Sequence, residues 1–187
     1  MIDVYDAMRV VLRHRDGGLV VPTEMAVGAW ADVTEDPSLD VPNPAMSKGS
    51  SIGLGLALAR PDRRVIVWDG DGGLLMNLGS LVTIAGLAPK NLYHIVLDNG
   101  MYATTGGQPV PNAGGFSFAG LAREAGYPKT YEFDDLEEWT TRIGEILNEE
   151  GPILIVVKSV PLIPDWLNMK RREIKSSAQI TRAALNS

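Results

Sequence analysis

Apolar runs that predict buried strands alternate along this chain with segments whose apolar residues recur at helical spacing. The strand-like runs cover residues 19–22, 64–68, 92–97 and 152–157. The helix-like segments cover residues 4–13, 50–59, 74–88, 116–125 and 134–150, and a polar helix is expected beyond residue 164. Such alternation is typical of an α/β fold built on a parallel sheet. The segments 32–44 and 102–115 are predicted to be irregular, because proline or glycine is frequent in them.

Length and composition narrow the class of protein. With 187 residues, the chain has room for one domain with one sizeable core. The absence of cysteine excludes disulfide scaffolds, zinc ribbons, iron–sulfur ligation and thiol nucleophiles. A net charge of −6 disfavours binding to nucleic acid or to anionic membranes. The first residues do not resemble a signal peptide, and the longest apolar stretch, 52–59, is far shorter than the ~20 residues that span a bilayer, so a cytoplasmic protein is expected.

Glycines and oxygen-bearing side chains follow two of the predicted strands. Residues 70–73 (GDGG) and 98–100 (DNG) each stand where a strand ends. In an open parallel sheet, ligands bind at the carboxyl ends of the strands, and glycines let the backbone approach a phosphate. Asp71 and Asn99 are therefore candidate oxygen ligands of a Mg²⁺ that also binds phosphate. The GDG alone is equally compatible with a tight turn that binds nothing, whereas the pair of motifs favours a metal–phosphate site.

Two other phosphate-binding motifs are excluded. The chain contains no G-x-x-x-x-G-K-[ST], which rules out a P-loop. The run after Trp68 lacks the third glycine of G-x-G-x-x-G, and Lys90 stands about where that motif needs an acidic residue. A dinucleotide-binding fingerprint is therefore unsupported.

The GDG at 70–72 and the NG at 99–100, separated by 26 residues, resemble the thiamine diphosphate (ThDP) binding motif GDG…NN, with Asp98 in place of the first asparagine. The segments PAMSKGSSIGLGLALA, GDGGLLMNLGSLVTIAGLAPKNL, LDNGMY and TTGGQP resemble the sulfopyruvate decarboxylase β subunit and the C-terminal half of phosphonopyruvate decarboxylase, over about residues 1–161. This resemblance implies a three-layer, doubly wound, mostly parallel sheet. It also implies a ThDP diphosphate-binding domain at 1–164 and a C-terminal helical tail at 165–187.

The resemblance assigns ligands to the motif residues. Asp71 and Asn99 would bind Mg²⁺ through their side chains, and Met101 through its backbone carbonyl. The glycines would contact the cofactor, with backbone N–H groups directed at the diphosphate; they are Gly70, Gly72 and Gly73.

Two further cofactor contacts are implied near residue 45. Met46 falls where a bulky apolar residue props ThDP in its V shape, and the carbonyl of Pro44 falls where the aminopyrimidine donates a hydrogen bond. Glycine is usual at the position of Pro44. Proline fixes φ, so the loop at Pro44 departs from the geometry usual in the family. Ser47, Lys48 and Gly49 also differ from the family's usual small-residue pattern just after Met46.

The resemblance also implies that half of the active site lies outside this chain. Enzymes of this family need a glutamate from a pyrimidine-binding domain, and 187 residues filled by one diphosphate-binding domain cannot encode it. We expect a separate pyrimidine-binding, alpha-type subunit, an assembly of at least a heterotetramer, and a chain that is catalytically inactive by itself.

Several residues outside the motif have both a functional and a simpler structural interpretation. Thr104, Thr105, Gly106 and Gln108 are candidates for a pocket that receives an anionic 2-oxo acid, or they form an ordered glycine loop. Glu24 follows a strand end, and it either faces the same cleft or is a solvated loop carboxylate. His94, inside an apolar strand, is predicted to be a hydrogen-bonded core residue.

The function expected from these observations is a subunit of a ThDP- and Mg²⁺-dependent decarboxylase of sulfopyruvate- or phosphonopyruvate-like 2-oxo acids. One alternative keeps the cofactor in a carboligase of the acetolactate synthase type. A ferredoxin-linked oxo-acid oxidoreductase subunit shares the motif, but this chain has no cysteine to hold a cluster. A non-catalytic phosphate- or nucleotide-binding module is the alternative from a different class.

Overall fold

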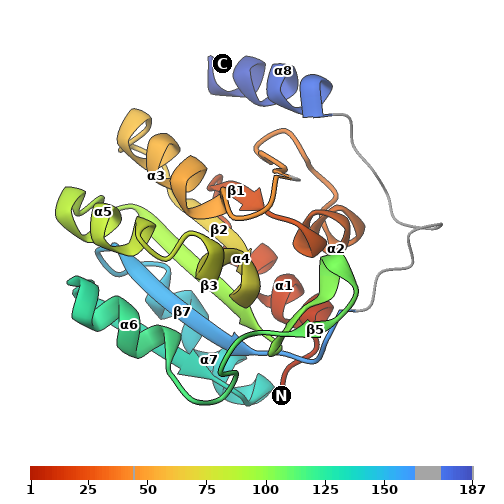
Figure 1. Cartoon of the computed structure of the whole chain (residues 1–187). Helices are drawn as coiled ribbons and strands as arrows, with labels where there is room; N and C mark the ends of the chain where they lie inside the picture. Colours follow the sequence, from red (N-terminus) through yellow and green to blue (C-terminus); the bar gives the residue numbers. More distant parts are fainter. Residues whose placement is uncertain (44, 163–173, 187) are drawn as a thin grey trace.

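The computed structural model describes residues 1–43, 45–162 and 174–186. Its centre is a sheet of five parallel strands in the order β1-β2-β3-β7-β6 (Figure 1). The strands are β1 (Leu19–Pro22), β2 (Val65–Gly70), β3 (Leu92–Asp98), β6 (Lys129–Phe133) and β7 (Ile153–Lys158). The α/β fold with a parallel sheet that the sequence predicts is therefore confirmed.

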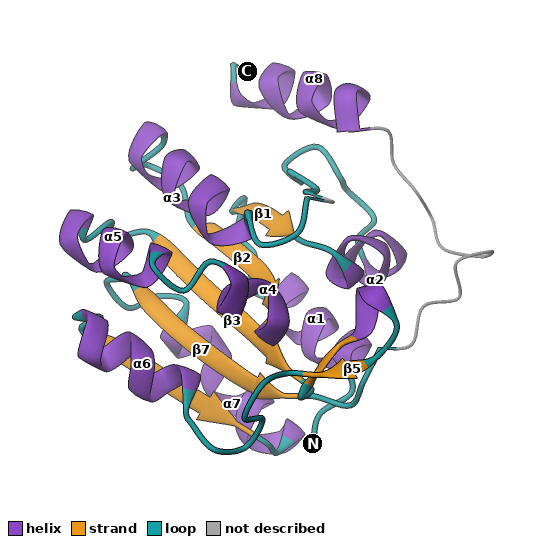
Figure 2. Ribbon diagram, in the orientation of Figure 1, coloured by secondary structure: helices purple, strands orange, loops and turns teal. Residues whose placement is uncertain are grey.

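Helices cover both faces of this sheet and give three layers (Figure 2). One face is covered by α1 (Val4–Arg13), α2 (Met25–Val33) and α7 (Leu136–Ile146). The other is covered by α3 (Gly49–Ala59), α4 (Asp71–Met76), α5 (Ser80–Leu87) and α6 (Phe118–Ala125). Alternate residues of a strand point to opposite faces, so each strand supplies both cores. In β3, Tyr93 and Ile95 enter the first core, whereas Leu92 and Val96 enter the second.

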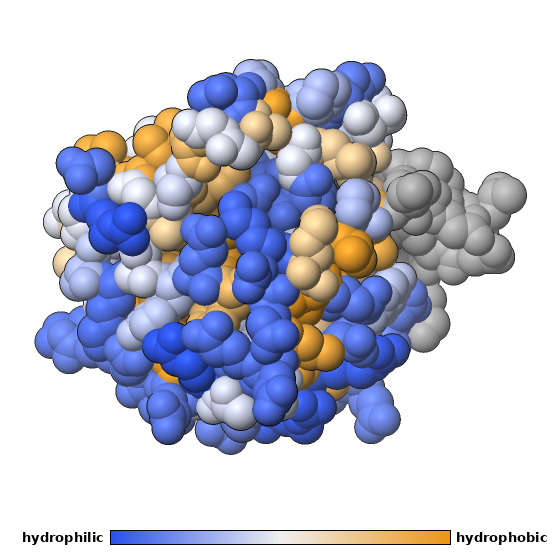
Figure 3. Space-filling view, turned by 90° about the horizontal axis from the view of Figure 1, so that it is seen from below, coloured by the Kyte–Doolittle hydropathy of each residue, from blue (hydrophilic) through white to orange (hydrophobic). Residues whose placement is uncertain are grey.

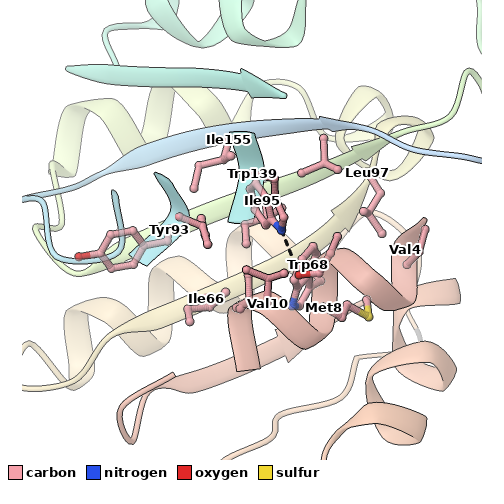
Figure 4. Packing of buried hydrophobic residues seen from close by; sticks show 14 of the residues in the cluster. Val4, Met8, Val10, Ile66, Trp68, Tyr93, Ile95, Leu97, Trp139 and Ile155 are labelled. Carbon is pink, nitrogen blue, oxygen red and sulfur yellow. Dashed lines mark hydrogen bonds between the residues drawn. The ribbon is translucent and has the colours of Figure 1, made fainter. Parts of the chain in front are cut away.

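Aromatic side chains pack among the aliphatic ones of the first core (Figure 4). The Trp68 ring lies between those of Trp30 and Trp139, with centroid distances of 6.4 and 6.5 Å. Trp139 also donates a hydrogen bond from Nε1 to the backbone oxygen of Ala7 at 3.2 Å. This bond satisfies the indole N–H in an otherwise apolar layer and joins α7 to α1.

Helix α3 packs closely on β2 because a glycine faces the strand. A Cβ at Gly53 would overlap a methyl group of Val67, so a larger residue there would push the helix off the sheet. Gly55 of the same helix differs, because a Cβ at Gly55 would meet open space.

Three elements differ from the prediction. The single helix expected over 74–88 is two helices, α4 and α5, separated by the segment 77–79 (NLG). Helix α2 was not predicted, and its last two residues fall in the segment 32–44 that was expected to be irregular. Strand β6 was also missed, since only one of its five residues, Phe133, is buried.

The segment 102–115, predicted to be irregular, contains two short strands, β4 (Met101–Tyr102) and β5 (Gln108–Pro109), which pair antiparallel. A 3₁₀ turn, η1 (Ala103–Thr105), lies between them. The expected tail helix is present as α8 (Ile174–Leu185), while residues 163–173 lie outside the described part. The division into a domain at 1–164 and a tail at 165–187 stays a prediction.

In the described ranges, no helix is long and apolar enough to cross a membrane. The face seen from below is mostly hydrophilic, with hydrophobic residues gathered in a few patches between the polar ones (Figure 3).

Candidate functional site

The predicted motif residues meet at the carboxyl ends of β1, β2 and β3. Strands β2 and β3 pair in register as far as Gly70 and Leu97, so the turns that follow them lie side by side. A cleft of about 540 Å³, open to solvent, lies there. Eight predicted site residues are in its wall: Met46, Gly70, Asp71, Gly72, Asn99, Met101, Thr104 and Thr105.

Asp71 connects the two motif turns. It is the first residue of α4, and only 1% of its surface is exposed. Its Oδ1 accepts a hydrogen bond from the backbone N–H of Gly72 at 2.7 Å. Its Oδ2 accepts from the backbone N–H groups of Asn99 at 3.2 Å and Gly100 at 2.6 Å. The carboxylate thereby fixes the turn after β2 against the turn after β3.

Burial raises the pKa of Asp71 from 3.8 to about 6, and the nearby Asp98 carboxylate acts in the same direction. The backbone N–H groups that Asp71 accepts lower the pKa, but they do not offset the burial. A positive charge nearby favours the ionised form of a carboxyl group. A cation at this position would therefore stabilise the buried Asp71 carboxylate.

The oxygen atoms around Asp71 suit a small, hard cation. Asn99 lies in a tight turn in which its Oδ1 accepts from the backbone N–H of Met101 at 3.0 Å, and Gly100 takes a left-handed φ of 75°. Carboxylate, amide and carbonyl oxygens are the ligands that Mg²⁺ prefers. Asp71, Asn99 and Met101 line the same cleft and carry one oxygen of each kind, so the chemistry of these residues fits Mg²⁺. Within the described residues, no group of three His, Cys, Asp or Glu side chains could hold a metal ion by itself. Phosphate oxygens of a ligand would therefore have to complete the coordination shell of the Mg²⁺.

Asp69 and His94 support the glycine turn from inside the second core. Both side chains are fully buried, and Asp69 Oδ2 lies 3.1 Å from His94 Nε2. Asp69 Oδ1 accepts from the backbone N–H of Gly70 at 3.0 Å and from the hydroxyl of Thr23 at 3.3 Å. His94 is thus a hydrogen-bonded core residue, as predicted.

Glu24 enters the cleft wall from the end of β1. Its Oε1 accepts a hydrogen bond from the backbone N–H of Ser47 at 3.0 Å. Burial raises the pKa of Glu24; the Ser47 bond lowers it, and the neighbouring carboxylates Asp69 and Asp71 raise it. Of the two roles left open for Glu24, the structure supports the one in the cleft. Sequence reasoning could place it there only through its position after a strand, since no motif contains it.

The remaining predicted residues lie around the mouth. Met46 is 46% exposed, on the loop that Ser47 ties to Glu24. The hydroxyl of Thr105 donates to Gln108 Oε1 at 3.3 Å, which orders the loop of the expected substrate pocket.

Three predicted residues lie outside the cleft wall: Gly73, Gly106 and Gln108. Pro44 lies outside the described residues. Tyr102, which the sequence did not single out, lines the cleft, and its ring covers Gly72 so closely that a Cβ there would overlap it.

The fold is a doubly wound α/β sheet, and glycines, a carboxylate and an amide gather at the carboxyl ends of its adjacent strands. These features define a class of domains that bind a cofactor or nucleotide through its phosphate groups. Residues 42–157 match the family model described as thiamine pyrophosphate enzyme, C-terminal TPP binding domain. The chain belongs to this family, and the resemblance found in the sequence is confirmed.

Relatives narrow the family further. The chain is 42% identical over 117 residues to sulfopyruvate decarboxylase subunit beta of Methanocaldococcus jannaschii, which covers 63% of this chain and 61% of the relative. It is 42% identical over 111 residues to phosphonopyruvate decarboxylase of Streptomyces hygroscopicus, covering 59% of this chain and 27% of the relative. The chain thus spans less than two thirds of the length of either relative.

A solved structure agrees on the fold. The thiamine diphosphate-dependent 4-hydroxybenzoylformate decarboxylase of Rhodococcus jostii superposes with a TM-score of 0.71 at 21% identity, over 87% of this chain and 33% of that one. The three-layer, doubly wound arrangement expected from the resemblance is therefore confirmed.

Proposed function

We propose that this chain is the beta-type subunit of a 2-oxo acid decarboxylase that depends on ThDP and Mg²⁺. The inferred substrate is a small 2-oxo acid with an anionic 3-substituent, such as sulfopyruvate or phosphonopyruvate. The observation that carries the proposal is the double hydrogen bond from the N–H groups of Asn99 and Gly100 to the buried carboxylate of Asp71. It joins both halves of the motif at one place where a cation is favoured.

Each residue of the motif has a proposed role. Asp71, Asn99 and the carbonyl of Met101 would hold Mg²⁺, and the turn formed by Gly70, Gly72 and Gly73 would receive the diphosphate. Bound ThDP supplies an electron sink for the carbanion left when CO₂ departs.

The mouth of the cleft would contribute positioning. Met46 would support the cofactor rings, and Pro44 would accept from the aminopyrimidine. Thr104 and Thr105 line the cleft and would offer hydroxyl groups to the anionic substrate. Gly106 and Gln108 would shape the loop behind them.

The other half of the active site is proposed to come from a separate pyrimidine-binding subunit, in at least a heterotetramer, so that this chain alone is inactive. In support, relatives are named subunit beta, and the chain spans only 27% of a phosphonopyruvate decarboxylase. Large hydrophobic side chains on α3 and α5 are half or more exposed: Leu58 50%, Val82 65% and Leu87 53%. Exposed apolar patches of this kind are typical of subunit interfaces.

A carboligase is the second candidate function. The chain is 27% identical over 140 residues to the acetolactate synthase isozyme 1 large subunit of Escherichia coli. The two reactions share the cofactor and differ in the final acceptor, which is a proton in the decarboxylase and a second carbonyl in the carboligase.

Calorimetric titration of ThDP with Mg²⁺ into the full chain, alone and mixed with its pyrimidine-domain partner, tests the proposal. We expect Mg²⁺-dependent binding, and CO₂ release from sulfopyruvate or phosphonopyruvate only in the mixture. Products from one and then two oxo acids separate decarboxylation from carboligation. Failure of ThDP to bind even in the mixture would leave a non-catalytic phosphate-binding module, and turnover by the chain alone would refute the shared active site.

A further inference from the structure

Glu24 occupies a backbone position that favours glycine. Its φ of 50° and ψ of −119° match the first central position of a type II′ turn, where a side chain is normally disfavoured. The surrounding backbone holds it there. The N–H of Glu24 donates to the carbonyl of Asn43 at 3.2 Å, and the N–H of Thr23 donates to the carbonyl of Trp68 at 3.0 Å. A carboxylate is thus projected from a strained residue into the cleft.

That carboxylate lies against the glycine turn. A Cβ added to Gly73 would come within 2.7 Å of Glu24 Oε1, and one added to Gly70 within 3.4 Å of Glu24 Oε2. The glycine surface that would admit a diphosphate is therefore in contact with a negatively charged side chain of the chain itself.

The same carboxylate fastens the loop that carries Met46. Its hydrogen bond from the N–H of Ser47 holds that loop to the end of β1, and Ser47 also has a left-handed φ, of 65°. Moving the Glu24 side chain would break this bond, so occupation of the glycine turn by a ligand and the position of the Met46 loop are coupled.

We propose that Glu24 determines the affinity of the cleft for diphosphate: its carboxylate occupies the glycine turn, and a diphosphate ligand enters only when this side chain moves out and releases Ser47. A diphosphate carries negative charge, and two like charges in contact repel strongly where water is partly excluded. A role for Glu24 as a further metal ligand is disfavoured by the lack, across the described ranges, of any three acidic or histidine side chains that converge on one point. The inference rests on the proposed function in taking the ligand to be ThDP.

The test compares the full chain with its Glu24→Gln and Glu24→Gly variants. Glu24→Gln keeps the size of the side chain and removes its charge, whereas Glu24→Gly removes both and suits the left-handed backbone. Glu124→Gln, which changes an exposed glutamate on α6, is the matched control. ThDP with Mg²⁺ and inorganic diphosphate with Mg²⁺ are titrated calorimetrically into each, and thermal melts show that each is folded.

We expect the dissociation constant for both ligands to fall at least about fivefold in Glu24→Gln and at least about tenfold in Glu24→Gly, with no change in the control. Binding by both variants that is equal to or weaker than that of the wild type overturns the inference. If the wild type binds ThDP with Mg²⁺ in the same experiment, the proposed function is unaffected by that result. Binding by the variants but not by the wild type supports the inference and counts against ThDP as the resident cofactor of the native chain. No binding of either ligand by any of them overturns the inference, and the proposed function is overturned as well only if ThDP also fails to bind in the mixture with the pyrimidine-domain partner.

Discussion

The two acidic residues of the cleft are held in very different ways. Asp71 is 1% exposed and accepts three backbone N–H groups, from Gly72, Asn99 and Gly100. Glu24 is partly exposed, accepts one backbone N–H, from Ser47, and stands on a backbone with a left-handed φ of 50°. The first carboxylate is fixed before any ligand arrives, whereas a single hydrogen bond from the described part of the chain holds the second.

This difference separates a residue that builds the site from one that regulates access to it. A carboxylate that accepts three backbone hydrogen bonds cannot move without undoing the turns after β2 and β3. A carboxylate with one bond and a strained backbone can exchange that bond for a contact with ligand at modest cost. Substitutions at and around the two carboxylates test whether they differ as sharply in solution.

Asp71→Ala should have the largest effect. It removes the charged ligand from the proposed Mg²⁺ site together with the acceptor of three N–H groups, so we expect Mg²⁺-dependent ThDP affinity to fall by about 1,000-fold or more, roughly 4 kcal/mol. Calorimetry with Mg²⁺ measures it. Asp134→Ala, at an exposed position before α7, should leave the affinity unchanged. Wild-type affinity in Asp71→Ala would contradict the metal assignment.

The raised pKa of Asp71 predicts a pH dependence of stability in metal-free buffer. The group titrates near 3.8 when unfolded and at about 6 when folded, so the folded state holds its proton over this window. The contribution of Asp71 to the unfolding free energy therefore falls as pH rises from about 4 to 6, by up to about 3 kcal/mol, and is constant above that range.

Urea unfolding of the wild type and Asp71→Asn in EDTA at pH 4, 5, 6 and 7 measures this dependence. Because asparagine does not titrate, the stability difference between the two proteins should shift in favour of the variant as the pH rises. A difference that stays constant across the range would show that Asp71 is not perturbed by burial.

Gly73→Ala tests how closely the carboxylates of Glu24 and Asp69 crowd the glycine turn. The added Cβ would lie 2.7 Å from Glu24 Oε1 and 2.8 Å from Asp69 Oδ1, so the unfolding free energy should fall by about 2 kcal/mol. Adding Glu24→Gly should recover part of this loss, since one of the two close contacts is removed.

Gly55→Ala on α3 provides the control for Gly73→Ala. Its Cβ meets open space, so alanine should stabilise the helix by about 0.5–1 kcal/mol. If the two alanine variants were equally tolerated, the glycine turn would be less crowded than the structure has it.

Asn99→Ala should lower ligand affinity much less than Asp71→Ala does. It removes a neutral metal ligand and the acceptor for the N–H of Met101, while the backbone N–H of Asn99 still bonds to Asp71. We expect Mg²⁺-dependent affinity to fall about tenfold, or roughly 1.4 kcal/mol. A loss as large as that of Asp71→Ala would mean that the two ligands are equally important to the site.

Local sequence signals predicted the parts of the fold that depend on local pattern. The buried strands β1, β2, β3 and β7 carry continuous apolar runs, and their parallel pairing follows from the helices between them. Strand β6 escaped prediction because its sequence, KTYEF, is mixed and only one of its residues, Phe133, is buried. The break between α4 and α5 was missed because it is only three residues long, 77–79 (NLG), and lies within an otherwise apolar run.

The site divides in the same way. The convergence of Asp71 and Asn99 could be predicted, because strands that pair in parallel bring their carboxyl ends together. The contacts of Glu24 could not be predicted, since they depend on a left-handed turn at one residue and on how closely the loop after Asn43 passes. Neither property has a signature in a single sequence.

The C-terminal helix has a consequence for the solution behaviour of the chain. Strand β1 lies at one end of the sheet, and the segment at 40–43 pairs with it through Val20 and Thr23. Thr181 of α8 fastens this segment by donating from its hydroxyl to the carbonyl of Asp40 at 2.8 Å. An unprotected outer strand invites addition of a strand from another molecule. A chain shortened before α8 would therefore be prone to aggregate during expression, even though every strand of the sheet is retained.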